Sequence, residues 1–318
     1  MNSTFKKIAS VIKKTKSIAI FTHVSADIDA LGSSLSLANA INSLNKNVKV
    51  FLNDKFTYSQ SLIFSQDFVD FGDCDKSQFD LMISTDVPNS QRLGKYEKVF
   101  VDFPKKIVLD HHENMNIKSD YFFADSNKSS CCEIVFEVLK AMKVKIVPEM
   151  ANYLFAGLSS DTGSFLNSNI NANSFKVALE LVKLNANVDK VNEYLYKEKT
   201  KKEILFTQYL WNNFEIKKDC AYCTVDYDTL LSMKGNKDDC VNFSRLLLAI
   251  EKIKFAFGLV EFKKGVFCLS MRGLAGCDVF TPAKNLGGGG HLCASGATFE
   301  AKDIKTATSM VLNELYKK

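Results

Sequence analysis

The sequence lacks the features of several protein classes. No apolar run in its 318 residues reaches the roughly 20 residues that a membrane-spanning helix needs, because charges such as Glu251 and Lys252 interrupt the longest one. The basic N-terminal segment is followed by a short apolar run that ends at His23, which is a poor match to a signal peptide. The formal net charge is only +5, so we expect affinity for phosphate groups without a long nucleic-acid partner. These absences predict a cytoplasmic globular protein with no membrane partner and room for two domains.

Cysteine is present but lacks the spacing of a disulfide framework. The nine cysteines are odd in number and scattered, which favours reduced thiols inside a cell. Cys220 and Cys223 form a C-x-x-C pair, but they lie in a segment that alternates like a strand, where positions three apart face opposite sides. No further metal ligands accompany them, so we expect neither a zinc site nor a redox centre there. The adjacent Cys131 and Cys132 are predicted to be small core residues.

The first half of the chain alternates short apolar runs with longer amphipathic ones. Such continuous strands separated by helices predict an α/β fold, with a parallel Rossmann-like sheet covered by helices on both faces. The predicted strands are 17–23, 48–53, 79–87 and 106–112. The predicted helices are 29–45, 131–142, 148–160 and 171–184.

The last hundred residues have a different pattern, which predicts a smaller mixed α/β domain. Its expected strands are 220–227, 255–262 and 265–273, and its expected helices are 237–252 and 302–318. A charged stretch at 197–203 is typical of a surface linker or an exposed helix turn. We therefore expect a catalytic domain at 1–190, a linker at 191–215 and a substrate-binding domain at 216–318.

Histidine is scarce, with only four residues, and all four lie in polar or glycine-rich segments. Acidic residues lie close to three of them, at the ends of predicted strands. In a parallel sheet covered by helices, ligands gather at the carboxyl ends of the strands. The candidate cleft therefore contains His23, Asp27, Asp29, Asp86, Asp110, His111, His112 and Asp161.

Taken singly, each of these acids also fits an ordinary turn or cap. Asp86 precedes Val-Pro-Asn and Asp161 precedes Thr-Gly, both good turn sequences. Taken together, so many carboxylates repel one another unless cations offset their charge, which favours bound divalent metals over a metal-free acid/base pair. Mixed imidazole and carboxylate ligands favour Mn²⁺, with Fe²⁺, Co²⁺ or Zn²⁺ as competitors. Two ions about 3.5–4 Å apart would clamp the attacking and leaving oxygens of a phosphoryl transfer.

A second candidate site lies near the C-terminus. Arg272 can hold a phosphate with two parallel hydrogen bonds, which lysine cannot do. The glycines at 287–290 let backbone N–H groups approach an anion, and we expect a short helix to start at Gly290 or His291 and add its positive end. A glycine run alone also fits a flexible linker. The histidine and small residues that follow favour binding, with Arg272, Gly288, Gly289, Gly290 and His291 as the substrate-binding residues.

These motifs, in this order, resemble those of the DHH phosphoesterase superfamily, and the C-terminal segment resembles its DHH-associated domain. The matching segments are H-x-x-x-D-x-D at 23–29, Asp86, D-H-H at 110–112, S-S-D-T-G-S-F at 159–165, and S-M-R-G with G-G-G-G-H at 270–291. The short two-domain layout is most similar to the nanoRNase/pAp phosphatase (NrnA-like) group. The chain departs from the usual pattern at Cys131 and Cys132, where serine or threonine is common, and at Ser160, where threonine is common.

The resemblance implies two manganese ions and a role for each site residue. The first ion is assigned to His23, Asp27 and Asp86, and the second to Asp29, Asp86, His111 and Asp161. His112 is implied to contact the reacting phosphate, while Asp110 orients the histidines. Arg272 and residues 288–291 are implied to grip the far phosphate or terminal group of the nucleotide.

The implied activity is hydrolysis of short oligoribonucleotides and of 3′-phosphoadenosine 5′-phosphate (pAp) to mononucleotides by a metal-activated water. The expected partners are short RNA and nucleotide phosphates, and a homodimer is compatible with this layout. A cyclic di-AMP or pApA phosphodiesterase needs the same metals, and a nucleotide sensor or RNA-binding module without catalysis is the rival from another class. A manganese pyrophosphatase fits less well, because that group closes its site with a different domain. A RecJ-type exonuclease also fits less well, because no further strand-binding domain is predicted.

Overall fold

The computed structural model describes residues 2–113, 115–197 and 199–317. Residues 1, 114, 198 and 318, which fall within predicted ranges, lie outside the described residues. The chain divides into two compact units, Met1–Glu198 and Lys199–Lys318. Each unit has its own sheet and its own hydrophobic cores. The predicted linker at 191–215 contains the helix α9, Lys201–Asn213.

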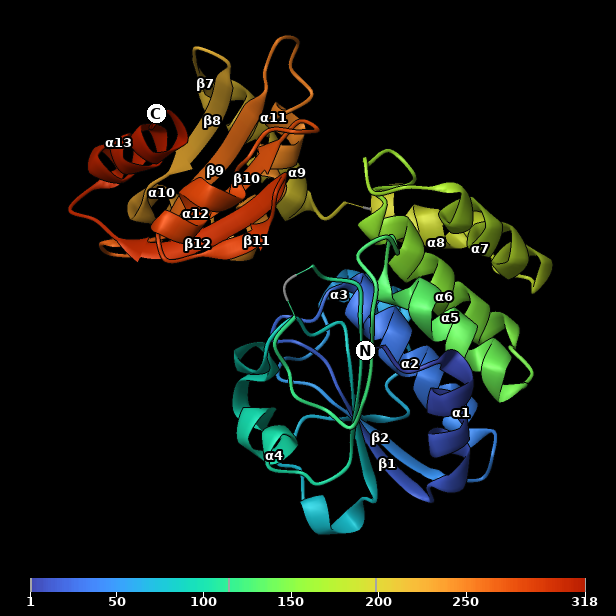
Figure 1. Ribbon diagram of the computed structural model, residues 1–318. Helices are drawn as coiled ribbons and strands as arrows, with labels where there is room; N and C mark the ends of the chain where they lie inside the picture. The colour runs from blue at the N-terminus through green and yellow to red at the C-terminus, as the bar shows by residue number, and fades with distance from the viewer. Residues whose placement is uncertain (1, 114, 198, 318) are drawn as a thin grey trace. The chain divides into compact units, whose positions relative to one another are not determined.

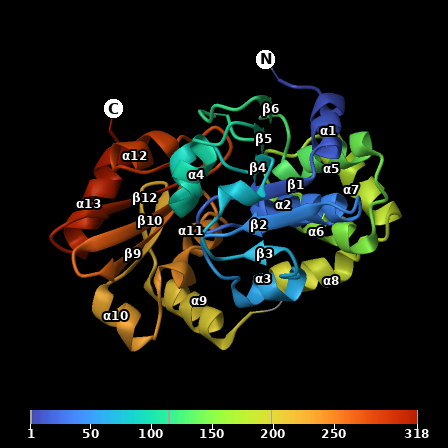
Figure 2. The ribbon, with the colours of Figure 1, turned by 90° about the horizontal axis from the view of Figure 1, so that it is seen from below.

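The first unit is built on a six-stranded sheet in which every neighbouring pair is parallel. Its order is β3-β2-β1-β4-β5-β6, as Figure 2 shows. The strands are β1 (Ser17–Phe21), β2 (Asn47–Phe51), β3 (Val69–Asp70), β4 (Leu81–Thr85), β5 (Lys106–Asp110) and β6 (Tyr121–Ala124). The fully buried central strands β1, β4 and β5 explain why the sequence pattern there is a continuous apolar run.

Helices cover both faces of this sheet (Figure 1). One core includes residues of α1 (Phe5–Lys14), α2 (Ile28–Asn42), α5 (Cys131–Met142), α6 (Pro148–Asp161), α7 (Ala172–Lys183) and α8 (Val188–Asn192). The other core packs η2 (Ser90–Tyr96) and α4 (Glu97–Val101) on the opposite face. The remaining elements are α3 (Tyr58–Ile63), η1 (Lys76–Gln78) and the π-helical turn η3 (Glu193–Lys197).

The predicted fold class is confirmed, and the predicted strands and helices of this unit lie where the sequence placed them within a few residues. The sequence predictions did not include the short edge strands β3 and β6 or the helices α1, α3, α4 and α8. Within the described residues, no helix is both long and apolar enough to cross a membrane.

The second unit is a mixed sheet of order β11-β12-β10-β9-β8-β7, in which only β8 and β9 pair in parallel. The strands are β7 (Glu215–Lys217), β8 (Cys220–Val225), β9 (Phe255–Lys263), β10 (Val266–Gly273), β11 (Gly289–His291) and β12 (Ala294–Glu300). Cys220 packs in the core on one face and Cys223 in the core on the other. The two thiols therefore lie on opposite faces of the sheet, as the strand pattern predicted.

The helices of this unit lie on both faces of its sheet (Figure 1). They are α9, α10 (Tyr227–Ser232), η4 (Lys237–Cys240), α11 (Phe243–Leu247), α12 (Phe280–Asn285) and α13 (Ile304–Leu315). The single helix predicted at 237–252 is wrong, because the chain forms η4 and α11 there as two short turns. Asn236 caps η4, and Cys240, Phe243 and Leu247 still bury one apolar face, which is the periodicity that suggested one helix.

Candidate metal centre

The histidines and aspartates meet at the carboxyl edge of the first sheet. His23 follows β1, Asp86 directly follows β4, and Asp110 is the last residue of β5. These strands are neighbours in the order β1-β4-β5, so their ends lie side by side. Asp86 has a φ of 61°, in the left-handed region that non-glycine residues seldom adopt. Such backbone strain concentrates at functional sites, and here it coincides with a buried carboxylate.

Three further acids come from helix ends. Asp27 is the N-cap of α2, and its Oδ1 atom accepts hydrogen bonds from the N–H groups of Asp29 and Ala30 at 3.0 Å each. Asp29 lies in the first turn of the same helix. Asp161 is the last residue of α6. Because α2 and α6 pack against each other beside the strand ends, one helix start and one helix end deliver these carboxylates to the same place.

His23 forms one group with two acids. Its Nε2 atom lies 3.7 Å from Oδ2 of Asp27 and 3.7 Å from Oδ2 of Asp86. Its other ring nitrogen, Nδ1, lies 2.8 Å from the carbonyl oxygen of Val24. A hydrogen bond from Nδ1–H to that carbonyl leaves the lone pair of Nε2 facing the carboxylates.

His111 forms a second group with three acids. Its Nε2 atom lies 3.4 Å from Oδ1 of Asp86, 3.3 Å from Oδ2 of Asp161 and 3.9 Å from Oδ2 of Asp29. Its Nδ1 atom lies 3.3 Å from the carbonyl oxygen of Lys128. Both histidines thus turn Nε2 to the acids and Nδ1 to a backbone carbonyl, and the two oxygens of Asp86 serve one group each.

The N-terminus of α5 holds Asp29 in place. The N–H groups of Cys131 and Cys132 donate to its two carboxylate oxygens, at 2.6 Å and 2.9 Å. Because these donors are backbone groups, the cysteine side chains that depart from the family pattern do not alter this contact. Ser130 is the N-cap of α5, and its hydroxyl oxygen accepts a hydrogen bond from the N–H of Glu133 at 3.3 Å. No local pattern indicates that this helix faces a residue about a hundred positions earlier.

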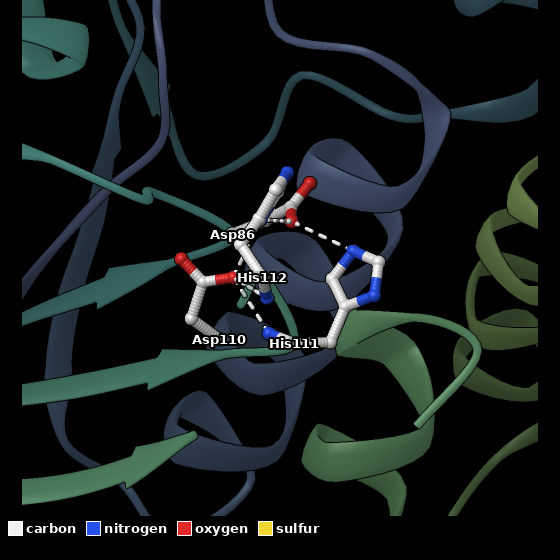
Figure 3. A group of neighbouring side chains, drawn as sticks. All are labelled: Asp86, Asp110, His111 and His112. Carbon is white, nitrogen blue, oxygen red and sulfur yellow. Dashed lines mark hydrogen bonds and ion pairs between the residues drawn. The ribbon is translucent and has the colours of Figure 1, made fainter. Parts of the chain in front are cut away.

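Asp110 orients the neighbouring histidine (Figure 3). Its Oδ1 atom accepts hydrogen bonds from the N–H groups of His111 and His112, at 2.6 Å and 2.9 Å, and lies 2.7 Å from Nδ1 of His112. Nδ1 of His112 also lies 3.5 Å from Oδ1 of Asp86. The structure therefore brings together all eight residues that the sequence predicted for this cleft.

The pKa values of the buried aspartates in the cluster are shifted in opposite directions. Burial and the charge of Asp86 raise the pKa of Asp29 to about 7. Burial and the charge of Asp29 likewise raise the pKa of Asp161 well above its usual value. Although burial opposes it, bonding to His111 and His23 holds the pKa of Asp86 well below its usual value. Without added cations, ionising all the acids of the cluster would place negative charges close together, and their mutual repulsion makes this unfavourable.

The donor set fits divalent metal ions. Three groups of ligand atoms lie close enough to hold an ion: His23 with Asp27 and Asp86, Asp29 with His111 and Asp161, and Asp86 with Asp110, His111 and His112. The buried Oδ1 atom of Asp86 accepts no hydrogen bond of standard geometry and has only the longer contacts with Nε2 of His111 at 3.4 Å and Nδ1 of His112 at 3.5 Å. A cation beside this oxygen would offset the cost of burying its charge. Imidazole nitrogens mixed with carboxylate oxygens suit first-row divalent ions.

In the second unit, the register places Arg272 and His291 on one sheet face. Arg272 of β10 pairs with Ala294 of β12, and Ala294 pairs with His291 of β11. Residues directly opposite in antiparallel strands share a face, so only the small Ala294 side chain stands between the other two. The expected helix at Gly290 or His291 is wrong, because β11 pairs with β12 there.

The glycine run is needed for this close strand pairing. A Cβ atom on Gly288 would lie 2.0 Å from the carbonyl oxygen of Gly296, and one on Gly290 would lie 2.5 Å from that of Ala294. Gly290 also has a φ of 141°. A side chain at either position would therefore push β11 away from β12 and displace His291.

The chain is similar in sequence and in fold to known proteins. Residues 17–158 match the model of the DHH family, N-terminal domain. The chain is 28% identical over 299 residues to the bifunctional oligoribonuclease and PAP phosphatase NrnA of Mycoplasma genitalium, covering 92% of each protein. It is 25% identical to the protein of the same name from Bacillus subtilis, covering 90% of each. The crystal structure of an exopolyphosphatase-related protein from Bacteroides fragilis has the same fold, with a TM-score of 0.91 at 23% identity over 98% of this chain and 95% of that one.

Proposed function

We propose that the chain is a manganese-dependent phosphoesterase that hydrolyses short oligoribonucleotides and pAp to mononucleotides, because residues 17–158 match the model of the DHH family, N-terminal domain. The relatives that match over most of the chain, which are named oligoribonucleases and PAP phosphatases, support this substrate class. A cytoplasmic location belongs to the proposal, since all nine cysteines are free thiols. Self-association into a homodimer stays a prediction.

One observation carries the proposal: the two oxygens of Asp86 face two different histidines, each within its own group of acids. His23, Asp27 and Asp86 would hold one ion, and Asp29, Asp86, His111 and Asp161 would hold the other. When bound, two such ions lower the pKa of a water molecule and offset negative charge on a phosphate. A carboxylate that serves both groups is what a two-ion site requires.

The other side chains of the site have roles that follow from their contacts. Asp110 fixes the ring of His112 through its Nδ1 atom, and the proposal assigns Nε2 of His112 to a phosphate oxygen. Val24 and Lys128 accept from the Nδ1 atoms of the two other histidines through their carbonyl groups. These backbone contacts hold each imidazole in the tautomer that presents a lone pair at Nε2.

The second unit supplies the substrate clamp of the proposal. Arg272, Gly288, Gly289, Gly290 and His291 would bind the far phosphate or terminal group of the nucleotide. The paired strands place Arg272 and His291 on one face, where a planar guanidinium and an imidazole can both reach an anion. The paired strands β10, β12 and β11 position these residues, in place of the helix N-terminus that the sequence predicted.

A substrate panel tests the function. Purified protein would be incubated with pAp, RNA of two to five nucleotides, pApA, cyclic di-AMP and pyrophosphate, with Mn²⁺ and with chelator. We expect chelator-sensitive release of mononucleotides from pAp and short RNA. Turnover of cyclic di-AMP or pApA alone would replace the assigned substrate class. Binding of nucleotide that stays intact with Mn²⁺ would favour a sensor without catalysis.

A further inference from the structure

Arg92 lies at the edge of the candidate metal centre and has no role in the reaction described so far. It belongs to η2, in the connection that follows Asp86. Its Nη2 atom lies 3.1 Å from Nδ1 of His23. Although the side chain is close to an acidic cluster, it forms no ion pair with any carboxylate in the part of the chain that the structure describes. Its positive charge is therefore not offset by a direct acidic partner.

The segment that carries Arg92 is firmly held. The carbonyl oxygen of Arg92 accepts a hydrogen bond from the N–H of Val24 at 2.7 Å. The side-chain amide of Asn53 bonds to the backbone on either side of Gly94, at 3.1 Å in both cases. Gly94 has a φ of 60°, and a Cβ atom there would lie 2.4 Å from Cγ1 of Val24. These contacts fix the backbone of Arg92 next to His23, and the exposed side chain reaches the ring of His23 from there.

The Nδ1 atom of His23 faces two groups that it cannot both satisfy. The carbonyl oxygen of Val24, at 2.8 Å, can only accept a hydrogen bond, and the guanidinium of Arg92 can only donate one. A neutral imidazole that offers the lone pair of Nε2 to an ion carries its proton on Nδ1. That proton then goes to Val24, and the N–H of Arg92 has no acceptor on the ring.

The geometry points to Arg92 as a catalytic residue that binds a non-bridging oxygen of the phosphate at the metal centre. This inference rests on the proposed function, which supplies the phosphate. A guanidinium without a carboxylate partner, held beside the cluster and released from the ring in the ligand-competent tautomer, matches the charge and planar geometry of a phosphate group. Arg92 would thus neutralise charge on the phosphate from the His23 side of the cluster, beyond what the proposed metal ligands do.

The competing role is structural: Arg92 would only position His23, and its removal would then weaken metal binding. The test measures two affinities by calorimetry on the full chain, that of Mn²⁺ for the free protein and that of orthophosphate for the Mn²⁺-loaded protein. The variants are Arg92→Gln and Arg92→Lys. Lys98→Gln serves as a matched control, because it removes one positive charge from an exposed side chain in the following helix.

We expect Arg92→Gln to weaken orthophosphate binding by about tenfold or more, the loss typical of a charge-assisted hydrogen bond, with Mn²⁺ affinity unchanged. Arg92→Lys should bind orthophosphate with an affinity between those of the wild type and Arg92→Gln. Lys98→Gln should have the orthophosphate affinity of the wild type. Wild-type orthophosphate affinity in Arg92→Gln, or a parallel loss of Mn²⁺ affinity, would overturn the inference. If the wild-type protein binds Mn²⁺ and orthophosphate but cleaves neither pAp nor RNA, the proposed function is refuted. The same titrations of the Arg92 variants would still decide whether Arg92 binds the phosphate. Absence of Mn²⁺ binding by the wild type would overturn both.

Discussion

Oδ1 of Asp86 lies 3.4 Å from Nε2 of His111, while the other oxygen of the same carboxylate faces a second histidine, His23, at 3.7 Å. This one side chain therefore joins the two groups of the cluster. Its left-handed backbone, directly after β4, aims it between them. Both groups of ligand atoms share this carboxylate, so its loss should affect the site more than the loss of a ligand that serves one group.

Removing the bridging charge should abolish turnover. Asp86→Asn keeps the size of the side chain but loses the negative charge that both groups share, so we expect no pAp hydrolysis and fewer than two bound Mn²⁺ ions per chain. Turnover assays and metal analysis after dialysis would check this. Asp73→Asn, at an exposed aspartate, is the control and should behave like the wild type. Substantial activity in Asp86→Asn would contradict the two-metal assignment.

Metal binding should release protons and weaken as the pH falls. The pKa of Asp29 is raised to about 7 by burial and the charge of Asp86, and bonding to Asp86 holds the pKa of His111 well above its usual value despite burial. An ion needs the carboxylate ionised and the imidazole neutral, so it displaces a proton from each group. Mn²⁺ affinity should therefore drop as the pH falls through about 7. Calorimetry in buffers of different ionisation enthalpy would measure the released protons, and buffer-independent heats would argue against this linkage.

The proposed clamp role of the second unit predicts a loss of activity that depends on the substrate. His291→Ala should mainly raise KM for short RNA and pAp, because it removes a side chain that shares a sheet face with Arg272. A small phosphodiester reporter without a far phosphate should stay partly cleaved. Steady-state kinetics on both substrates would show the difference. An equal loss on both would be inconsistent with the clamp.

Two neighbouring glycines offer a matched test of the strand pairing. Gly288→Ala should destabilise the second unit by about 1–3 kcal/mol, since the new Cβ atom meets the carbonyl oxygen of Gly296. Gly289→Ala should have little effect on stability, because nothing lies within 4 Å of a Cβ atom there. Thermal unfolding of both variants would be compared with the wild type. Equal stability of the two would mean that β11 does not pack as described.

Much of the first unit could be predicted from sequence because local pattern and final environment agree there. The central strands are buried on both faces, so their apolar runs are continuous, and the polar residues that end them identified the site. The edge strands β3 and β6 are short and only half-buried, so their pattern carries little signal.

The parts that sequence reasoning missed depend on distant segments. The carboxylate of Asp29 accepts hydrogen bonds from the backbone N–H groups of Cys131 and Cys132. Because backbone groups do not depend on residue type, the sequence does not reveal these contacts. The glycine run forms a strand rather than the start of a helix because residues Gly289–His291 pair with β12, which follows them in the chain. Arg92 has no motif around it that indicates a site, and only its position beside His23 reveals it.

Anomalous scattering from crystals grown with Mn²⁺ tests the central claim most directly. The account predicts two peaks about 3.5–4 Å apart, as two-metal phosphoesterase sites require. One peak should lie among His23, Asp27 and Asp86, and the other should contact His111 and the second oxygen of Asp86. A single peak, or peaks that do not share Asp86, would contradict it.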